Sequence, residues 1–569
     1  MERDGAGARE RKRHGRHYTP TALARFLAGR VAARVVAPGS GVRVLDPACG
    51  SGELLFAIRA ALAERLPGVP VELVGYDLDP EGLVVARERA AREGIPVDWR
   101  QADFLAECSA LPAESFHVVI ANPPYVRTQQ LGGAAAQALR GQFGLRGRFD
   151  LTHPFVAAVP RLLGPDGVLG LLCANRFLTT KAGANLRAVL LGELAPVELY
   201  DLGDTKLFEA AVLPAVTIAV RGRTRERCRY ASVYQENCDG RESPADAGRD
   251  GGESLPDHEP FVAKENLFEV LSAGTDATVR WQGRQFAVTV GELAIPPGSA
   301  SMGWRMARVG HDDWLDAVSA RMWRTFGDLA RIRVGIKTNA DRVFIAAHWG
   351  DPETEPELLC DLITHHDLRP WRIENTRRTR VLYPYELDHP RRLPVELAQY
   401  PRTAAYLEQH RETLSARSYL TGAGRKWFEH WVPQRPHMWR TPKVVFPDIS
   451  DRPRFALDRS GAVVNGDCYW MSLSELRSEV PAEELACLMM GIANSALGVR
   501  FYDAVCGNRL YSGRRRWITQ YVSRLPLPDP ATAQAVAIVG LVRELAQEAE
   551  SGPAAQHELD DLVNRAFAL

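Results

Sequence analysis

The chain has 569 residues, 46% of them hydrophobic and 25% charged, which is typical of a folded globular protein and excludes a disordered or collagen-like chain. Its 70 Lys+Arg residues balance 70 Asp+Glu residues, so a protein coated in positive charge is excluded, although a local basic surface is not. No apolar run reaches the roughly 20 residues of a membrane span, no signal-peptide core opens the chain, and the nine cysteines form no CxxC pair; we therefore expect a cytoplasmic protein with reduced thiols, no membrane contact and no metal site.

The first 225 residues alternate short β-rich runs with amphipathic helical segments, a pattern that predicts a parallel sheet with helices on both faces. The expected strands are, in chain order, VRVLDP, VELVGYDLD, FHVVIANPP, GVLGLLCA, VELYDLG and PAVTIAVRG. Only DTKLFEAAVL separates the last two, which is too short for a helical crossover. We therefore expect those two strands to pair antiparallel, as a hairpin at the edge of the sheet.

The remainder of the chain is less regular and richer in Trp, Arg and Pro. We predict five segments: a flexible basic tail (1–16), the α/β domain (17–225), a linker with a small β-rich segment (226–314), an α+β or β-rich binding domain (315–530) and C-terminal helices (531–569). Two basic stretches with interleaved aromatic residues, Arg369 to Arg380 and Gly507 to Trp517, lie in the second half. A solvated surface is the simpler interpretation of either stretch alone, and contact with nucleic acid is the other.

The stretch VRVLDPACGSGELL is a strand followed by a glycine turn and the start of a helix. Gly50 and Gly52 allow a ligand to approach the backbone closely, and the helix N-terminus offers free amide donors. The third glycine of the dinucleotide fingerprint is missing, and no P-loop sequence occurs. Asp46, before Pro47, places a carboxylate at the strand tip, where it can accept a hydrogen bond from an ammonium group. The loop therefore favours an uncharged or cationic ligand with an amino-acid end.

Two more carboxylates follow at expected strand ends. Asp77 ends the second strand, where a carboxylate can bind both ribose hydroxyls of a nucleoside. Asp103 could accept a hydrogen bond from an adenine amine, with Phe104 beside the ring. One such aspartate is usually a turn or helix-cap residue. Three of them beside a glycine turn indicate a nucleoside site.

The strand FHVVIA ends in Asn122-Pro123-Pro124-Tyr125, and two consecutive prolines stop the strand and fix the backbone. The side-chain oxygen of Asn122 and the carbonyl oxygen of Pro123 can accept both hydrogens of a planar NH2 group. That contact favours a pyramidal nitrogen and turns its lone pair towards an electrophile. Tyr125 can stack on the flat ring that carries the amine. The alternative interpretation is a plain Pro-Pro turn.

The motifs HYTP (His17 to Pro20), DPACGSGELL, GYDLDP, ADFL and NPPY, in this order, resemble the gamma-class DNA adenine-N6 methyltransferases of the TaqI type. The resemblance implies an α/β fold: a Rossmann-like, seven-stranded, S-adenosylmethionine-dependent methyltransferase domain, followed by an α+β target-recognition domain and C-terminal helices. The second half is similar to such recognition domains more loosely, through IRVGIKTNADRVFI, RKWFEHW, PKVVFPDIS and SRLPLPDP.

The resemblance also implies roles for individual residues. The residues implied to hold S-adenosylmethionine are Tyr18, Thr19, Asp46, Pro47, Ala48, Gly50, Gly52, Asp77, Asp103, Phe104 and Asn122. The residues implied to hold and stack on the target base are Asn122, Pro123, Pro124, Tyr125 and Phe208, and Asp150 is a support residue. The candidate DNA contacts of the second half are Lys337, Thr338, Arg514, Arg515 and Arg516.

The function that the resemblance implies is transfer of a methyl group from S-adenosylmethionine to adenine N6 in double-stranded DNA, after the base is flipped from the duplex. The implied setting is restriction-modification or phage defence, with a separate restriction nuclease or other defence components as partners. The alternative is an NPPY-type methyltransferase that acts on RNA or on a protein glutamine, because these substrates also present a planar amine or amide. A fused nuclease is disfavoured because only 16 residues precede HYTP and no PD…(D/E)xK array is present. A degenerate fold that only binds DNA is disfavoured by the intact motifs.

Overall fold

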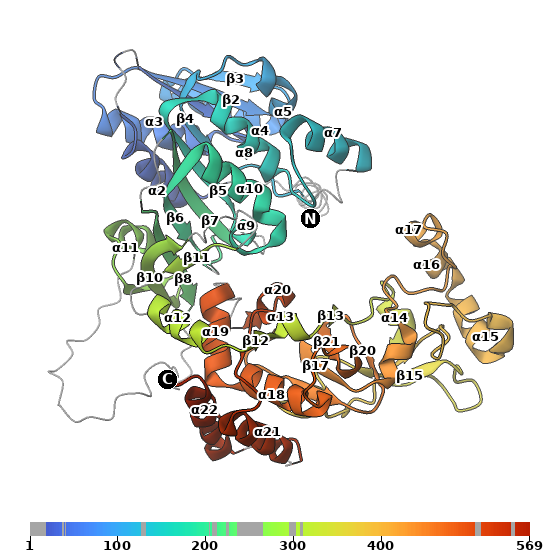
Figure 1. Ribbon diagram of the computed structural model, residues 1–569. Coiled ribbons are helices and arrows are strands. Elements are labelled where there is room, and N and C mark those ends of the chain that lie inside the picture. Colours follow the sequence, from blue (N-terminus) through green and yellow to red (C-terminus); the bar gives the residue numbers. More distant parts are fainter. Residues whose placement is uncertain are drawn as a thin grey trace. The chain divides into compact units, whose positions relative to one another are not determined.

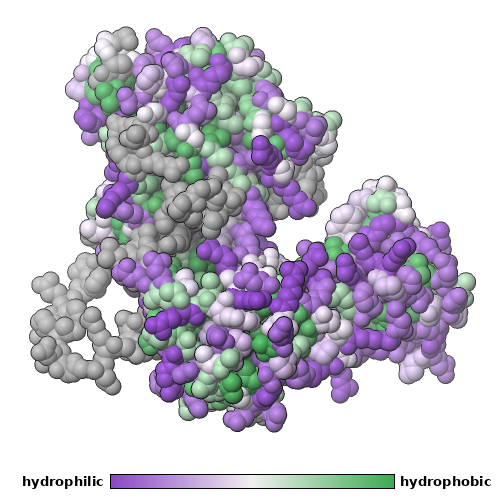
Figure 2. All heavy atoms as spheres, in the orientation of Figure 1, coloured by the Kyte–Doolittle hydropathy of each residue, from purple (hydrophilic) through white to green (hydrophobic). Residues whose placement is uncertain are grey.

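The computed structural model describes residues 19–36, 39, 41–126, 132–203, 205–207, 213–222, 227–235, 266–294, 303–307, 311–506, 514–547 and 552–569 (Figure 1). The chain divides into two compact units. Unit 1 contains Met1–Arg308 with Arg509–Gly513, and unit 2 contains Val309–Asn508 with Arg514–Leu569. On the face drawn in Figure 2, hydrophilic residues are interspersed with hydrophobic ones on the visible surface of each unit.

Unit 1 is built on one large mixed sheet with the strand order β11-β10-β8-β6-β7-β5-β4-β1-β2-β3, and β9 pairs with β10. The strands are β1 (Val42–Asp46), β2 (Val71–Asp77), β3 (Asp98–Gln101), β4 (Phe116–Ala121), β5 (Leu163–Ala174), β6 (Leu194–Asp201), β7 (Pro214–Arg221), β8 (Arg229–Gln235), β9 (Ala277–Trp281), β10 (Arg284–Ala294) and β11 (Arg305–Ala307). Strands β1 to β5 pair in parallel, whereas β7 runs antiparallel to both β5 and β6. The predicted parallel sheet and the antiparallel β6–β7 hairpin are confirmed.

Helices cover both faces of this sheet (Figure 1). They are α2 (Thr21–Ala32), α3 (Glu53–Arg65), α4 (Pro80–Glu93), α5 (Phe104–Glu107), α7 (Gly133–Phe143), α8 (Thr152–Leu162), α9 (Arg176–Thr179), α10 (Ala184–Gly192) and α11 (Leu267–Ala273). Successive residues of β4 alternate between two cores: Val118 and Ile120 join α2 and α3, while Val119 joins α8 and α10. Burial on both faces explains why the central strands read as continuous apolar runs.

Three features of the sheet differ from the sequence-based expectation. Strand β3 lies before Asp103, as the expected strand-end position of that aspartate implies, but its short polar sequence DWRQ carries no apolar alternation and is not among the strands expected above. The β6–β7 hairpin is not at the sheet edge, since β8 pairs with β6 in parallel and β10 continues the sheet beyond it. The described strands of segment 226–314, where a small β-rich segment is expected, therefore extend the sheet of unit 1, and the sheet has more than the seven expected strands. The added strands bury Val233, Val279 and Phe286 in the core shared with α2.

Unit 2 combines small sheets with helices. Two four-stranded sheets have the orders β13-β21-β17-β19 and β14-β16-β15-β20, and the pairs β12–β23 and β18–β22 stand apart. Their strands are β12 (Arg324–Thr325), β13 (Arg333–Val334), β14 (Ile345–Ala346), β15 (Leu359–Ile363), β16 (Arg380–Leu382), β17 (Lys443–Pro447), β18 (Ile449–Ser450), β19 (Ala456–Asp458), β20 (Val463–Val464), β21 (Cys468–Ser472), β22 (Arg515–Arg516) and β23 (Pro526–Leu527).

The helices of unit 2 are α12 (His311–Ala320), α13 (Phe326–Leu329), α14 (Asp341–Phe344), α15 (Pro401–Gln409), α16 (Arg411–Ser415), α17 (Ser418–Thr421), α18 (Ala482–Asn494), α19 (Ala496–Cys506), α20 (Thr519–Val522), α21 (Ala533–Leu545) and α22 (Pro553–Ala566). Helix α18 is central: Leu485 and Leu488 share one core cluster with Ile538, Val542 and Leu559 of the last two helices. The expected C-terminal helices thus exist, and they pack into the same core as segment 315–530.

Within the described residues, no single helix is long and apolar enough to cross a bilayer; α18 and α19 meet that criterion only together, and they bend by 69° at their junction. The same residues contain no group of three or more His, Cys, Asp or Glu side chains placed to hold a metal ion.

Candidate active site

The glycine turn after β1 is packed so tightly that it requires glycine at residue 52. Gly52 has φ of 81° and precedes the first residue of α3. A Cβ atom there would lie 2.8 Å from the ring of Trp99 and 2.9 Å from that of Phe56. A side chain would therefore be both strained and crowded. The contact partner Trp99, on β3, is not among the residues predicted above, because the short polar sequence DWRQ carries no apolar alternation.

Asp46, the last residue of β1, is 1% exposed, and its Oδ1 accepts a hydrogen bond from the Ala48 N–H at 3.0 Å. Burial raises the pKa of this carboxyl group to about 8, and the nearby charge of Asp77 adds to the rise, while the Ala48 N–H opposes it. Without a partner the group is therefore a neutral acid at pH 7. A cation bound beside it would favour the ionised form.

Asp77, the last residue of β2, ties that strand to the glycine turn. Its Oδ2 accepts from the Gly50 N–H at 2.7 Å and its Oδ1 accepts from the Asp79 N–H at 2.8 Å. Because each carboxylate oxygen can accept more than one hydrogen bond, two hydroxyl donors can still be accommodated. Next to it, Leu78 is 63% exposed. The sequence analysis missed Leu78, although an apolar residue between two aspartates in a strand-end turn is the signal that could have found it.

Asp103 and Phe104 differ in their availability to a ligand. Asp103 caps α5, with Oδ1 accepting from the Leu105 N–H at 2.9 Å. Phe104 is 2% exposed, and its ring stacks on Phe155 at 5.7 Å and meets Tyr76 edge-on at 5.5 Å. The Phe104 ring fills the apolar layer against α8, and its expected contact with the adenine ring of the cofactor stays a prediction.

Asn122 follows β4 at the same edge of the sheet as Asp46. Strands β1 and β4 are parallel neighbours, with Leu45 opposite Val119, so their carboxyl ends leave the sheet together. The Asn122 Nδ2 donates to Thr19 Oγ1 at 3.0 Å, and the Tyr125 hydroxyl donates to Asn122 Oδ1 at 2.6 Å. The amide, the glycine turn and the start of the chain's first described helix thus converge on one place.

Of the residues implied for this site, the structure describes Thr19, the Asp46–Gly52 turn, Asp77, Asp103, Phe104 and Asn122 to Tyr125. Pro123 is buried, and Pro124 and Tyr125 are half-buried. Burial raises the pKa of Tyr125 well above its ordinary value, and the nearby charge of Asp150 adds to the rise, so its hydroxyl stays protonated and can donate. Tyr18 and Phe208 lie outside the described residues.

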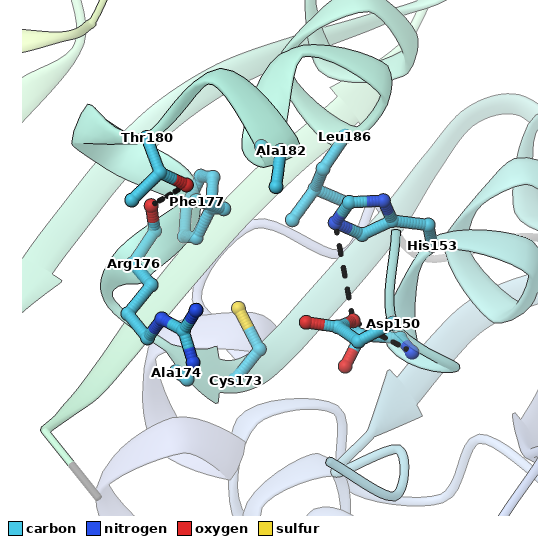
Figure 3. A pocket seen from close by; sticks show the side chains of 11 residues that line it. Asp150, His153, Cys173, Ala174, Arg176, Phe177, Thr180, Ala182 and Leu186 are labelled. Atoms are coloured by element: carbon cyan, nitrogen blue, oxygen red, sulfur yellow. Dashed lines mark hydrogen bonds and ion pairs between the residues drawn. The ribbon is translucent and has the colours of Figure 1, made fainter. Parts of the chain in front are cut away.

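A small pocket of about 30 Å³ adjoins the end of β5, enough for one or two water molecules (Figure 3). Asp150, His153, Cys173 and Arg176 line it. The His153 Nε2 lies 3.9 Å from Asp150 Oδ1. Burial lowers the pKa of His153 and raises that of Cys173, so the pocket holds a neutral imidazole and a neutral thiol. Asp150, the implied support residue, therefore sits in a water-sized polar pocket.

The candidate DNA contacts Lys337 and Thr338 of unit 2 differ in exposure. The Lys337 side chain is exposed. Thr338 is 1% exposed, and its hydroxyl donates to Asp341 and accepts from the Ala340 N–H. The Thr338 hydroxyl is engaged in the turn before α14, and its expected contact with a phosphate stays a prediction.

The three consecutive arginines also differ. Arg515 makes a two-bond pair with Asp503, with both contacts at 2.7 Å. Arg516 pairs with Asp448 at 3.0 and 3.2 Å while remaining exposed. Arg514 is exposed. The positive charge of Arg515 is therefore balanced within unit 2, and Arg514 is the better-placed candidate for contact with an anion.

Comparison with known proteins places this geometry in a family. Residues 85–208 match the family described as Eco57I restriction-modification methylase, and residues 13–146 match the RMKL-like methyltransferase domain. The Type II methyltransferase M.BanIII of Aneurinibacillus aneurinilyticus is 33% identical over 563 residues, which cover 94% of this chain and 93% of that protein. The chain belongs to the Type II restriction-modification methyltransferase family.

Other relatives agree with this assignment. The Type II methyltransferase M.XhoI of Xanthomonas vasicola is 27% identical over 520 residues, covering 85% of this chain and 86% of that protein. The solved structure of the Type IIL restriction-modification enzyme MmeI in complex with DNA matches with a TM-score of 0.55 over 96% of this chain and 71% of that one. Its 12% identity shows the fold alone.

The Type II assignment confirms the prediction of a methyltransferase of the restriction-modification type. Unit 1 has the class I S-adenosylmethionine-dependent methyltransferase fold. Because relatives match over nearly the whole chain and are named Type II methyltransferases, the main interpretation is favoured over an enzyme acting on RNA or on protein glutamine.

Proposed function

We propose that this Type II methyltransferase transfers the methyl group of S-adenosylmethionine to N6 of adenine in double-stranded DNA, with the target base flipped out of the duplex. The observation that carries the proposal is the convergence of Asn122 and the Asp46–Gly52 turn at one edge of the sheet. An amide oxygen that can hold an amine thus lies beside a turn that can hold an amino-acid ligand.

The cofactor residues fit S-adenosylmethionine by their chemistry. The buried Asp46 carboxyl group suits the ammonium of the methionine end, and Asp77 retains acceptor capacity for the ribose hydroxyls. Exposed Leu78 offers an apolar surface to the face of the adenine ring, and Asp103 lies at the neighbouring strand end. When bound, the cofactor supplies an electrophilic methyl group on a sulfonium centre.

The residues that hold the target amine act by orienting it towards the methyl group. Asn122 Oδ1 and the Pro123 carbonyl oxygen would accept the two N–H groups of the target amine, which favours a pyramidal nitrogen with its lone pair directed at the methyl group. No strong base is required, because the nitrogen loses its proton during or after attack. The rate then depends on alignment and electrostatics. The choice of adenine rests on the resemblance to the gamma-class enzymes.

The remaining parts of the proposal concern partners. We propose that unit 2 contacts the DNA, with Lys337 and Arg514 among the contacts to phosphate, and that the biological setting is a restriction-modification or defence system with a separate nuclease. Both side chains are exposed, and among the described residues neither forms an ion pair, which supports phosphate binding, since a paired arginine must first lose its partner.

The test is tritiated methyl transfer from S-adenosylmethionine to duplex DNA, ribosomal RNA and release factor, followed by identification of the methylated base. We expect label in DNA as N6-methyladenine. Asn122→Ala should reduce transfer by at least about 100-fold while cofactor affinity, measured by equilibrium dialysis, stays within about twofold. Asn185→Ala, on α10, is the matched control and should retain activity. Label in RNA or protein, or full activity of Asn122→Ala, would contradict the proposal.

A further inference from the structure

Thr19 is held beside Asn122 by a well-anchored helix. The bond from Asn122 Nδ2 to Thr19 Oγ1 joins residues 103 positions apart in the sequence. Helix α2 begins two residues after Thr19 and buries Leu27 and Val31 against the sheet. The fit there is close, since a Cβ atom on Gly170 of β5 would lie 2.4 Å from Val31 and 3.2 Å from Leu27. The position of Thr19 relative to the sheet edge is therefore fixed by packing.

An asparagine amide needs such a fixed neighbour, because its two ends are chemically opposite. A half-turn about the last side-chain bond would exchange the oxygen with the NH2 group. An NH2 group facing the target amine would meet it donor to donor. The function of Asn122 in the proposed reaction therefore depends on which way its amide points.

Two hydroxyl groups settle that direction. A phenol is a much better donor than acceptor, and the Tyr125 hydroxyl lies 2.6 Å from the amide oxygen, so it selects Oδ1. An alcohol oxygen accepts readily, and Thr19 Oγ1 lies 3.0 Å from Nδ2. A carbonyl oxygen has two lone pairs, so the bond from Tyr125 is compatible with a second bond from an incoming amine.

We infer that Thr19 is a positioning residue for methyl transfer: its hydroxyl oxygen holds the Asn122 amide with Oδ1 presented to the target amine. The inference rests on the proposed function of Asn122 and goes beyond the cofactor contact that the HYTP resemblance implies for Thr19. Both roles are compatible, because a hydroxyl that accepts from Nδ2 keeps its own proton to donate to a carboxylate. Thr19 then joins the methionine end of the cofactor to the amide that holds the acceptor.

The test separates positioning from cofactor binding. Single-turnover transfer to duplex DNA is measured at saturating S-adenosylmethionine, and cofactor affinity is measured separately by calorimetry. Thr19→Val removes the acceptor at nearly constant volume and should slow transfer roughly 3- to 10-fold, which corresponds to one net hydrogen bond. Thr19→Ser keeps the hydroxyl and should transfer within about twofold of the wild-type rate.

A double-mutant cycle then shows whether Thr19 acts through Asn122. On the Asn122→Ala background, Thr19→Val should slow the residual transfer by less than about twofold, because the amide is already absent. A wild-type rate for Thr19→Val at saturating cofactor, or an equal slowing on both backgrounds, would overturn the inference. If Thr19→Val melts at a lower temperature than the wild type, Thr19→Ala takes its place, because it removes the same acceptor without adding a methyl group. Its transfer rate at saturating cofactor and its effect on the Asn122→Ala background then test the inference in the same way.

The outcomes also distinguish this inference from the proposed function. A wild-type protein that methylates no DNA contradicts the function itself. A wild-type protein that methylates DNA, together with an unaffected Thr19→Val variant, contradicts only the positioning role.

Discussion

Lowering the pH from 7 to 6 should weaken the binding of S-adenosylmethionine about ninefold, through the protonation of Asp46. The Asp46 carboxyl is buried at the tip of β1, and its pKa is raised to about 8, first by burial and then by the charge of Asp77. The group is therefore neutral below pH 8 and ionised above it. A cationic ligand prefers the ionised form, so affinity should rise with pH across this window.

The magnitude follows from the proton equilibrium. If the ligand binds only to the ionised carboxyl, the apparent dissociation constant is proportional to one plus the ratio of protonated to ionised Asp46. For a pKa of about 8 that ratio is about 100 at pH 6 and about 10 at pH 7, which gives the ninefold change. The α-amino group of the ligand has an ordinary pKa of about 8, so it stays mostly protonated in this range. Burial raises the pKa of Cys49, and its thiol does not titrate here.

The assay is isothermal titration calorimetry at pH 6 and pH 7, in two buffers of different ionisation enthalpy. Binding should release close to one proton at pH 6, which appears as a buffer-dependent enthalpy. Asp46→Asn is the matched control: its side-chain oxygen can still accept from the Ala48 N–H, and its affinity should be weaker at pH 7 and nearly independent of pH. A flat affinity in the wild type, or an equal slope in Asp46→Asn, would refute the reasoning.

Two further predictions concern an ion-pair cluster in each unit. Glu198→Gln should lower the free energy of unfolding by about 3 kcal/mol at pH 7, measured by urea denaturation, because the buried carboxylate bonded by Arg30 and Arg34 is lost. Burial opposes ionisation of Glu198, but hydrogen bonds, led by that from Arg30, lower its pKa from 4.5 to about 2. The stabilisation by the ionised carboxylate is therefore present above pH 4.5 and is lost as the pH falls towards 2. A wild-type stability that does not fall in that window would contradict the role given to Glu198. In unit 2, Arg514→Ala should weaken DNA binding and reduce the slope of log affinity against log salt concentration by about one, measured by fluorescence anisotropy. Arg515→Ala should chiefly lower the free energy of unfolding, because Arg515 is paired with Asp503. If Arg515→Ala weakened DNA binding more than Arg514→Ala, the pair with Asp503 would not decide which arginine contacts phosphate.

The sequence predicted the site wherever the signal is local. Asp46, Asp77 and Asn122 each follow an apolar run directly, so the residue order alone places them at strand ends. The neighbouring positions of β1 and β4 followed from the general arrangement of doubly wound sheets. Short-range pattern and the topology rules of doubly wound sheets were therefore sufficient to place Asp46, Asp77 and Asn122 at strand ends.

The features that the sequence did not predict have a common cause, which is that burial and pairing depend on residues distant in sequence. The ring of Phe104 points into the core because Phe155 of α8 stacks on it. The charge of Arg516 is paired with Asp448, 68 positions away. Strand β8 joins the sheet by pairing in parallel with β6, and no local sequence pattern predicts that pairing. Composition and spacing carry no information on such contacts.

The bond between Thr19 and Asn122 gives the threonine of the early HYTP motif a physical role beside the Asn122 to Tyr125 turn. The following helix lies on the face of the sheet that contains Val118 and Ile120 of the Asn122 strand, and its Arg30 is fixed by Glu198 of β6. Helix α2 is anchored at both its apolar face and its last turn, and it positions Thr19, whose hydroxyl we infer to orient the Asn122 amide together with that of Tyr125. Loss of the Glu198 anchor should therefore slow methyl transfer as well as lower stability, and the slowing should vanish on the Asn122→Ala background, where no amide remains to be oriented.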